Sequence, residues 1–209
     1  LINLIGLPSI LFIVYQGGLI FKLFLCLVMF LAIIEFSELM NIKGYSINKL
    51  FLFSFIPVFI SEIYLLLFSV YHITNTSLII VYALILFIWE IFRSKNTPLE
   101  NIALTIFGSV WIIYNLHLFN CIREYHFHGL TLTLLMLLSV WSCDSAAFYF
   151  GSKFGKKKIL PLVSPNKTWI GTIAGFLSAI LIAYIFGYLF PQLNLKYYDI
   201  LIFGTIIGI

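Results

Sequence analysis

Long apolar runs separated by short polar segments make up most of this sequence, and they restrict the chain to a membrane-embedded fold. Hydrophobic residues make up 62% of the 209 positions and charged residues only 10%, whereas a typical soluble domain carries about 25% charged residues. The chain therefore has too little polar surface to cover a water-facing body. Because the runs are continuous rather than alternating, they predict membrane helices and not the strands of a barrel.

The apolar runs predict an all-α fold, a polytopic transmembrane helical bundle with about seven complete spans and the start of an eighth. A helix needs about 20 apolar residues to cross the hydrocarbon core. The expected spans lie near residues 2–15, 19–40, 50–71, 78–92, 100–119, 129–149, 169–190 and from 199 onward. The last run is still apolar at Ile209, so we expect a single membrane-embedded domain over 1–209 that is incomplete at its C-terminus.

Basic residues are concentrated in alternate connecting segments. Three of these segments hold nine of the twelve basic residues, and they are residues 41–49, 93–99 and 150–168. By the positive-inside rule these segments face the cytoplasm. We therefore predict a multi-pass protein of the inner (cytoplasmic) membrane, with the Lys-rich loop 150–168 on the cytoplasmic side. Lys22 lies near the other face, where its long side chain can snorkel to the interface.

The segment Asp144–Gly171, DSAAFYFGSKFGKKKILPLVSPNKTWIG, carries the densest group of polar residues in the chain. Its five lysines are Lys153, Lys156, Lys157, Lys158 and Lys167. A cationic loop between two apolar spans, with a carboxylate at its entrance, predicts binding of a phosphorylated, metal-chelated substrate at a membrane surface. The alternative is an ordinary positive-inside loop that is anchored by anionic headgroups.

Asp144 closes an apolar run, and a carboxylate at that place costs free energy unless it is paired, hydrated or bound to a metal. Mg²⁺ prefers one or two carboxylates together with substrate phosphates, so Asp144 is a candidate metal ligand. It could equally be a helix-end residue in water or paired with a loop lysine. Gly151 and Gly155 would let the backbone approach a ligand closely.

The run Ser164–Trp169 predicts a helix start, with Ser164 as the N-cap and Pro165 in the first turn. Exposed amides at such an end attract anions, and Lys167 and Thr168 would add a charge and a hydroxyl beside them. A bare helix start is the competing interpretation. The small-residue spacings at Gly171 and Gly175, and at Gly204 and Gly208, predict close helix packing. Glu62 and Glu90, in or near apolar spans, could mark a pathway or lie at helix ends.

The chain resembles the phosphatidate cytidylyltransferase family, also called the CDP-diacylglycerol synthases. Members carry a run like D-x-G-A-Y-x-x-G-x-x-F-G-K followed by L-x-P-x-(V/I)-S-P-x-K-T-W-E-G. The match covers about 28 residues, and its positions are Asp144, Ala147, Gly151, Phe154, Gly155, Lys156, Leu160, Pro161, Val163, Ser164, Pro165, Lys167, Thr168, Trp169 and Gly171. Three positions differ, with Ala146 for glycine, Phe148 for tyrosine and Ile170 for glutamate. The family's further signature would lie beyond Ile209.

The resemblance implies an enzyme, a CTP:phosphatidate cytidylyltransferase of phospholipid biosynthesis. Such an enzyme transfers CMP from CTP to phosphatidate, giving CDP-diacylglycerol and pyrophosphate. The implied cofactor is Mg²⁺, and the implied partners are CTP, phosphatidate and the bilayer, with no nucleic acid; a homodimer is left open.

The resemblance also assigns roles to individual residues. Asp144 and Lys167 would be catalytic, with Asp144 also the metal ligand. The substrate-binding residues would be Lys153, Lys156, Ser164, Thr168, Gly151 and Gly155.

Two other functions are compatible with the topology. A small transporter or lipid flippase would explain the spans and the intramembrane glutamates, but not the grouping of five lysines with the S-P-x-K-T-W run. A related CTP-dependent lipid kinase is the other alternative.

Overall fold

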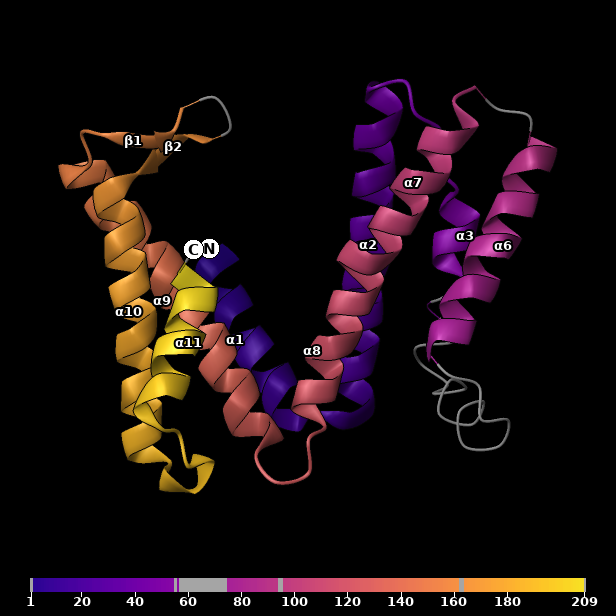
Figure 1. Cartoon of the computed structure of the whole chain (residues 1–209). Helices are drawn as coiled ribbons and strands as arrows, with labels where there is room; N and C mark the ends of the chain where they lie inside the picture. Colours follow the sequence, from indigo (N-terminus) through magenta and orange to yellow (C-terminus); the bar gives the residue numbers. More distant parts are fainter. Residues whose placement is uncertain (1, 55, 57–74, 94–95, 162–163, 209) are drawn as a thin grey trace. The chain divides into compact units, whose positions relative to one another are not determined.

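A computed structural model describes residues 2–54, 56, 75–93, 96–161 and 164–208. Most of these residues are helical, as the sequence predicts, and the chain is a predominantly helical membrane protein. It forms two compact units, Leu1–Glu124 and Tyr125–Ile209; the elements of both are labelled in Figure 1.

Four of the described helical stretches are long and apolar enough to cross a membrane. They are α2 (Gly18–Ile42), the stretch Pro98–Arg123, α9 (Gly129–Phe154) and α10 (Trp169–Leu189). Three further helices lie where spans were predicted, namely α1 (Ile2–Gln16), α6 (Asn75–Arg93) and α11 (Tyr197–Gly208). The span predicted near 50–71 lies mostly outside the described residues, which give only α3 (Lys49–Phe53) in its first part. The total of seven to eight spans stays a prediction.

In the first unit, α2 supplies a buried stripe. Phe21, Leu25, Met29 and Ile33 are each at most 1% exposed and follow one another at intervals of four residues, so they lie on one helix face. The stretch beside α2 is longer than the predicted span 100–119. It consists of α7 (Pro98–Gly108), a π-helical turn η1 (Ser109–Tyr114) and α8 (Asn115–Arg123).

Two of the three basic segments are in contact within the first unit, and the side of the membrane on which they lie stays a prediction. At one end, the Arg93 guanidinium donates to the Ser46 carbonyl at 2.9 Å, which brings segments 41–49 and 93–99 together. At the other end, Lys22 pairs with Glu124 at 3.0 Å. The positive-inside rule predicts few basic residues on the face where Lys22 lies. The ion pair with Glu124 gives Lys22 a partner there.

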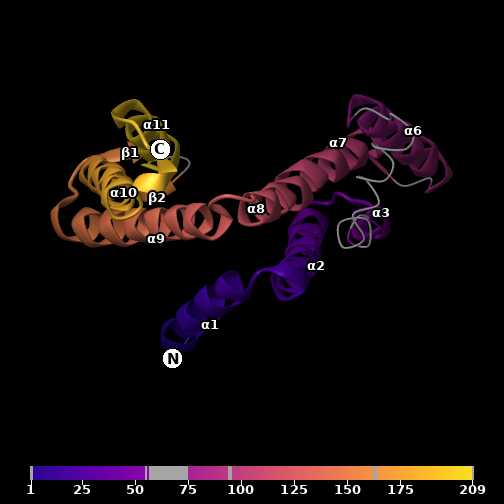
Figure 2. The same ribbon diagram turned by 90° about the horizontal axis from the view of Figure 1, so that it is seen from below.

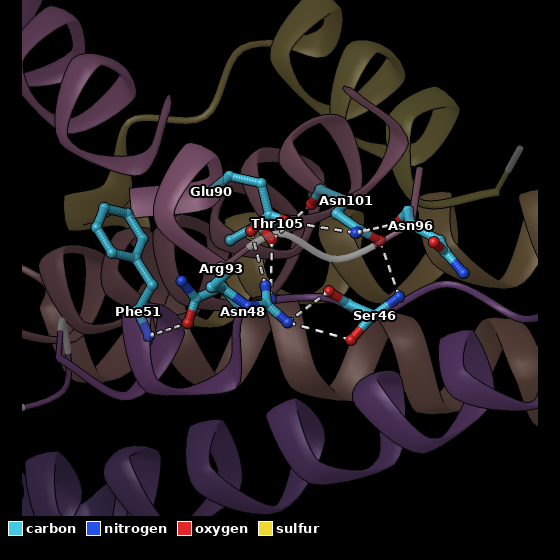
Figure 3. Close-up of polar contacts among 8 residues, drawn as sticks. All are labelled: Ser46, Asn48, Phe51, Glu90, Arg93, Asn96, Asn101 and Thr105. Carbon is cyan, nitrogen blue, oxygen red and sulfur yellow. Dashed lines mark hydrogen bonds and ion pairs between the residues drawn. The ribbon is translucent and has the colours of Figure 1, made fainter. Parts of the chain in front are cut away.

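A buried polar network joins α6, α7 and the α2–α3 connection (Figure 3). Glu90 is only 2% exposed; its carboxylate accepts hydrogen bonds from Arg93 at 2.7 Å and from Asn101 at 3.0 Å. The Asn101 side chain also accepts from the Ser46 amide at 2.8 Å. These contacts give Glu90 a structural role, since its charge is paired inside the unit. Glu62 lies outside the described residues.

The second unit is built on α9, α10 and α11, which lie side by side in both views (Figures 1 and 2). The predicted packing glycines are confirmed. Gly171 and Gly175 are buried against Ala147 and Cys143 of α9, and Gly204 and Gly208 of α11 face α10.

A short β-hairpin lies between α9 and α10, where we predicted a loop over 150–168. Residues 150–154 continue α9, and β1 (Lys158–Leu160) then pairs antiparallel with β2 (Ser164–Thr168). The all-α fold class is confirmed, and the predicted loop is in fact the last turn of α9 followed by this two-stranded hairpin. The backbone amides and carbonyls of the two strands bond to each other. The apolar runs on either side of this segment predict helices and give no sign of strand pairing between them.

We expect Gly175→Ala to lower the free energy of unfolding by about 1–2 kcal/mol, because an added methyl group overpacks the helix contact. A Cβ at this position would lie 2.9 Å from the Cys143 sulfur and 3.1 Å from the Cys143 carbonyl oxygen. The matched control is Gly187→Ala, also in α10, where the nearest atom would be 3.7 Å away and the better helix propensity of alanine should dominate. Reversible unfolding in mixed micelles measures both variants. Equal stability of the two variants would contradict the proposed packing.

We expect Glu90→Gln to destabilise the first unit by about 1–3 kcal/mol, because the variant weakens charged hydrogen bonds inside the protein. The control is Glu124→Gln in the more exposed pair with Lys22, where less than about 1 kcal/mol is expected. The same unfolding experiment compares them. A larger effect at Glu124 than at Glu90 would rule out the network as the main polar contact of this unit.

Candidate functional site

A cavity of about 350 Å³ lies within the second unit, bordered by α9, β2, the first turns of α10 and the last turn of α11. Its polar lining is formed by Asp144, Ser164, Asn166, Lys167, Thr168 and Thr172. Acidic, basic and hydroxyl side chains from three elements therefore border one space. This volume lies at the small end of the range for ligand pockets, about 300–1,000 Å³.

Four of the eight predicted site residues border this cavity. They are Asp144, Ser164, Lys167 and Thr168. Asp144 belongs to α9, and the other three belong to β2. Asp144 is twenty or more residues away from them in the sequence, so the fold brings the four residues together. Lys153, Lys156, Gly151 and Gly155 are not among the residues that line it.

Asp144 does not lie at the end of a helix, as the sequence suggested. It lies within α9, ten residues before Phe154, the last residue of that helix, or about 15 Å along the helix axis at 1.5 Å per residue. No proline interrupts the ten residues that follow Asp144 in this helix. A carboxylate this far inside an apolar helix needs water, a cation or a partner, and the cavity provides space for one.

Thr168, and not Ser164, is the N-cap of α10. Its side-chain oxygen accepts a hydrogen bond from the Gly171 amide at 3.2 Å. Ser164 begins β2, where its Cα is paired with that of Leu160. The expectation that Ser164 and Pro165 start the helix is therefore wrong, because strand pairing extends to Thr168 and delays the helix by four residues.

Gly151 and Gly155 are packed against Thr168. A Cβ on Gly151 would lie 3.1 Å from the Thr168 side-chain oxygen, and one on Gly155 would lie 2.7 Å from the Thr168 Cβ. Their lack of side chains makes room for Thr168. Close approach to a ligand by these glycines stays a prediction.

The other lysines lie on the exposed outside of this region. The Lys153 ammonium is 5.4 Å from the centre of the Tyr149 ring and 5.6 Å from that of Phe154, a cation–π arrangement. Lys156, Lys157 and Lys158 are exposed around the start of the hairpin. They form a cationic surface near the site and do not form its lining.

Some cavity residues were not identified from the sequence as candidate site residues. Asn166 was inside the recognised motif, but nothing distinguished it as a lining residue. Thr172 lies four residues after Thr168, so helical spacing could have placed it near the same face. Phe148 follows Asp144 by four residues in α9 and is 79% exposed. The lining at Ile207 and Gly208 depends on the packing of α11 and could not be predicted.

The residues present fit Mg²⁺ only as an ion shared with a substrate. Within the described part of the chain, no group of three or more His, Cys, Asp and Glu side chains could hold a metal. Asp144 is the carboxylate that borders the cavity. One carboxylate together with phosphate oxygens and water is a common way of binding Mg²⁺, whereas a closed cage of protein ligands would need more donors.

A sequence model of the cytidylyltransferase family matches residues 1–209. The chain belongs to the cytidylyltransferase family. Proteins named phosphatidate cytidylyltransferase are similar to it, including one from Bacillus subtilis (strain 168), 25% identical over 199 residues that cover 95% of this chain and 74% of the relative. The one from Staphylococcus saprophyticus is 26% identical over 212 residues, 98% of this chain and 76% of the relative.

A phosphatidate cytidylyltransferase from Haemophilus influenzae is more similar over a shorter stretch, 47% identical over 60 residues. That stretch covers 29% of this chain and 21% of the relative. The resemblance first noted over Asp144–Gly171 is thus confirmed at the level of the family.

Two departures from the family pattern lie together on another surface of this cytidylyltransferase-family chain. Ala146 and Ile170 border an apolar groove of about 450 Å³ that is formed by α9 and α10. Neither residue is among those lining the polar cavity. Ile170 therefore takes no part in the lining of the polar cavity.

Proposed function

We propose that this protein is a CTP:phosphatidate cytidylyltransferase, which transfers CMP from CTP to phosphatidate and releases pyrophosphate. The observation that carries the proposal is the shared cavity of Asp144 and Lys167, inside a membrane helix unit of a cytidylyltransferase-family chain. The names of the similar proteins support the choice of phosphatidate as acceptor. The transporter or flippase alternative is not favoured, because neither the family nor these relatives carry such a function.

In the proposed reaction, a phosphate oxygen of phosphatidate attacks the α-phosphorus of CTP. A new P–O bond forms, the bond between the α-phosphorus and its bridging oxygen breaks, and pyrophosphate leaves with that electron pair. Such a transfer needs alignment and neutralisation of charge rather than a covalent enzyme intermediate. A lysine and a carboxylate that border one space are suited to this task.

Lys167 would neutralise negative charge on the nucleotide phosphates, and the Ser164 hydroxyl would donate a hydrogen bond to a phosphate oxygen. Asp144 would hold Mg²⁺ jointly with those phosphates, and the ion would supply charge neutralisation for the leaving pyrophosphate. Lys153 and Lys156, which lie outside the cavity, would raise the local concentration of the anionic nucleotide by long-range attraction.

The position of the cavity suits a lipid acceptor. Asp144 and Thr172 belong to helices long and apolar enough to cross a membrane, so a lipid phosphate can reach the cavity from the bilayer while its acyl chains stay among apolar surfaces. We place the Lys-rich segment on the cytoplasmic side of the inner membrane, where CTP is available. A homodimer stays a prediction.

We expect Lys167→Ala and Asp144→Ala each to lower turnover by at least about tenfold, which corresponds to roughly 1.4 kcal/mol of activation free energy. The measurement is Mg²⁺-dependent formation of CDP-diacylglycerol from labelled CTP and phosphatidate, by protein expressed from the complete reading frame and reconstituted in lipid vesicles. Ile170→Ala is the matched control, since Ile170 borders the apolar groove instead of the cavity, and its turnover should stay within about twofold of the unaltered protein.

Wild-type turnover in both charged-residue variants would remove the assignment of this cavity as the active site. Absence of labelled CDP-diacylglycerol with the unaltered protein would remove the proposed function itself.

A further inference from the structure

We propose that Thr168 is a positioning residue, which holds Lys167 at the cavity through the backbone and does not itself bind substrate. The inference rests on the proposed function and gives Thr168 a role different from the substrate contact that the sequence suggested. Its basis is a junction formed by the Thr168 side chain and three glycines, Gly151, Gly155 and Gly171.

Thr168 is almost fully enclosed, with 3% of its surface exposed. Its hydroxyl oxygen accepts the hydrogen bond from the Gly171 amide that caps α10. The cap bond leaves the hydroxyl hydrogen free to be donated, so it is the burial of this side chain, and not the cap bond, that keeps it from a substrate phosphate. The side chain borders the cavity, but its hydroxyl oxygen is engaged in the protein interior.

The three glycines create the space that Thr168 fills. A Cβ on Gly151 would lie 3.1 Å from the threonine oxygen, and one on Gly171 would lie 3.0 Å from it. A Cβ on Gly155 would lie 2.7 Å from the threonine Cβ. These glycines belong to the last turn of α9, to its C-cap and to the first turn of α10. One side chain thus fixes the ends of two helices against each other.

The backbone around Thr168 is held from the hairpin side as well. The Trp169 amide donates to the Lys157 carbonyl at 3.1 Å, and Thr168 pairs with Lys158 in the two-stranded sheet. Lys167 is the residue directly before this anchored position. Its backbone is therefore fixed on the α10 side, and its side chain borders the cavity from there.

The placement of Lys167 matters as well as its charge. The positive charge has to be near the phosphate oxygens where negative charge develops, and a displacement of about 1 Å can cost about 100-fold in rate. Loss of the Thr168 anchor should therefore lower the rate through Lys167. It should have little further effect once the Lys167 ammonium is absent.

The test is a double-mutant cycle in the CDP-diacylglycerol assay, with full-length protein in lipid vesicles. We expect Thr168→Val, which keeps the side-chain volume but removes the cap, to lower kcat about tenfold with KM for CTP changed less than about threefold. Thr168→Ser, which keeps the cap, should retain kcat within about threefold. Thr168→Val combined with Lys167→Ala should be no slower than Lys167→Ala alone, because interacting positions are not additive.

Gly155→Ala provides a second variant that substitutes neither Thr168 nor Lys167. Its added methyl group would clash with the Gly151 carbonyl oxygen and with the Thr168 side chain. It should therefore displace Thr168 and lower kcat about tenfold, again with no further loss in the Lys167→Ala background. The matched control is Thr205→Val in α11, whose exposed hydroxyl donates to its own helix at Leu201 and whose loss should leave kcat unchanged. Thermal unfolding of each variant identifies any that fail to fold. If Thr168→Val fails to fold, the cycle that combines Gly155→Ala with Lys167→Ala tests the inference.

Full additivity of the Thr168 or Gly155 change with Lys167→Ala would overturn the inference. So would a Thr168→Val variant with normal kcat and a raised KM for CTP, which would make Thr168 a substrate contact. If the unaltered protein forms CDP-diacylglycerol, either of these two results contradicts the inference about Thr168 but not the proposed function. An inactive unaltered protein removes the proposed function instead.

Discussion

The close approach of α9 and α10 is the contact on which the candidate site depends. It is possible because Gly151, Gly171 and Gly175 carry no side chain where the helices meet. Without a hydrophobic driving force between helices in lipid, such contacts depend on tight packing and short backbone separations. The same approach brings the end of β2 next to α9. The distance between Asp144 and the Lys167 strand is therefore set by helix packing that involves neither residue.

The two units differ in the surroundings of a carboxylate that lies within an apolar helix. In the first unit, the buried Glu90 is satisfied by Arg93 and Asn101, so its charge contributes to the joining of helices. In the second unit, Asp144 lies well inside a long apolar helix and borders a cavity. A polar cavity within a membrane-spanning unit costs free energy that tight packing would avoid. Glu90 is thus a structural carboxylate, whereas Asp144 is the carboxylate for which we propose a function.

Sequence reasoning grouped four residues that do border one cavity, but it gave their segment the wrong local structure. Asp144, Ser164, Lys167 and Thr168 were predicted together, and all four border the cavity. The helix start was predicted at Ser164, since Ser-Pro is a common N-terminal pair, yet Thr168 is the cap. Pairing of β1 with β2 outweighed the local preference. Local signals could not reveal this, because the partner strand is so short.

The sequence by itself determined the membrane-embedded helical class, the basic segments and the family, because uninterrupted apolar runs and a dense motif are properties of the chain order. Tertiary structure alone decided that Gly151 and Gly155 accommodate Thr168, that Lys153 and Lys156 stay outside the cavity, and that Ile170 borders an apolar groove. These facts depend on which faces of α9 and α10 meet. Helix rotation and crossing are set by packing between elements, which the order of residues in either helix does not specify.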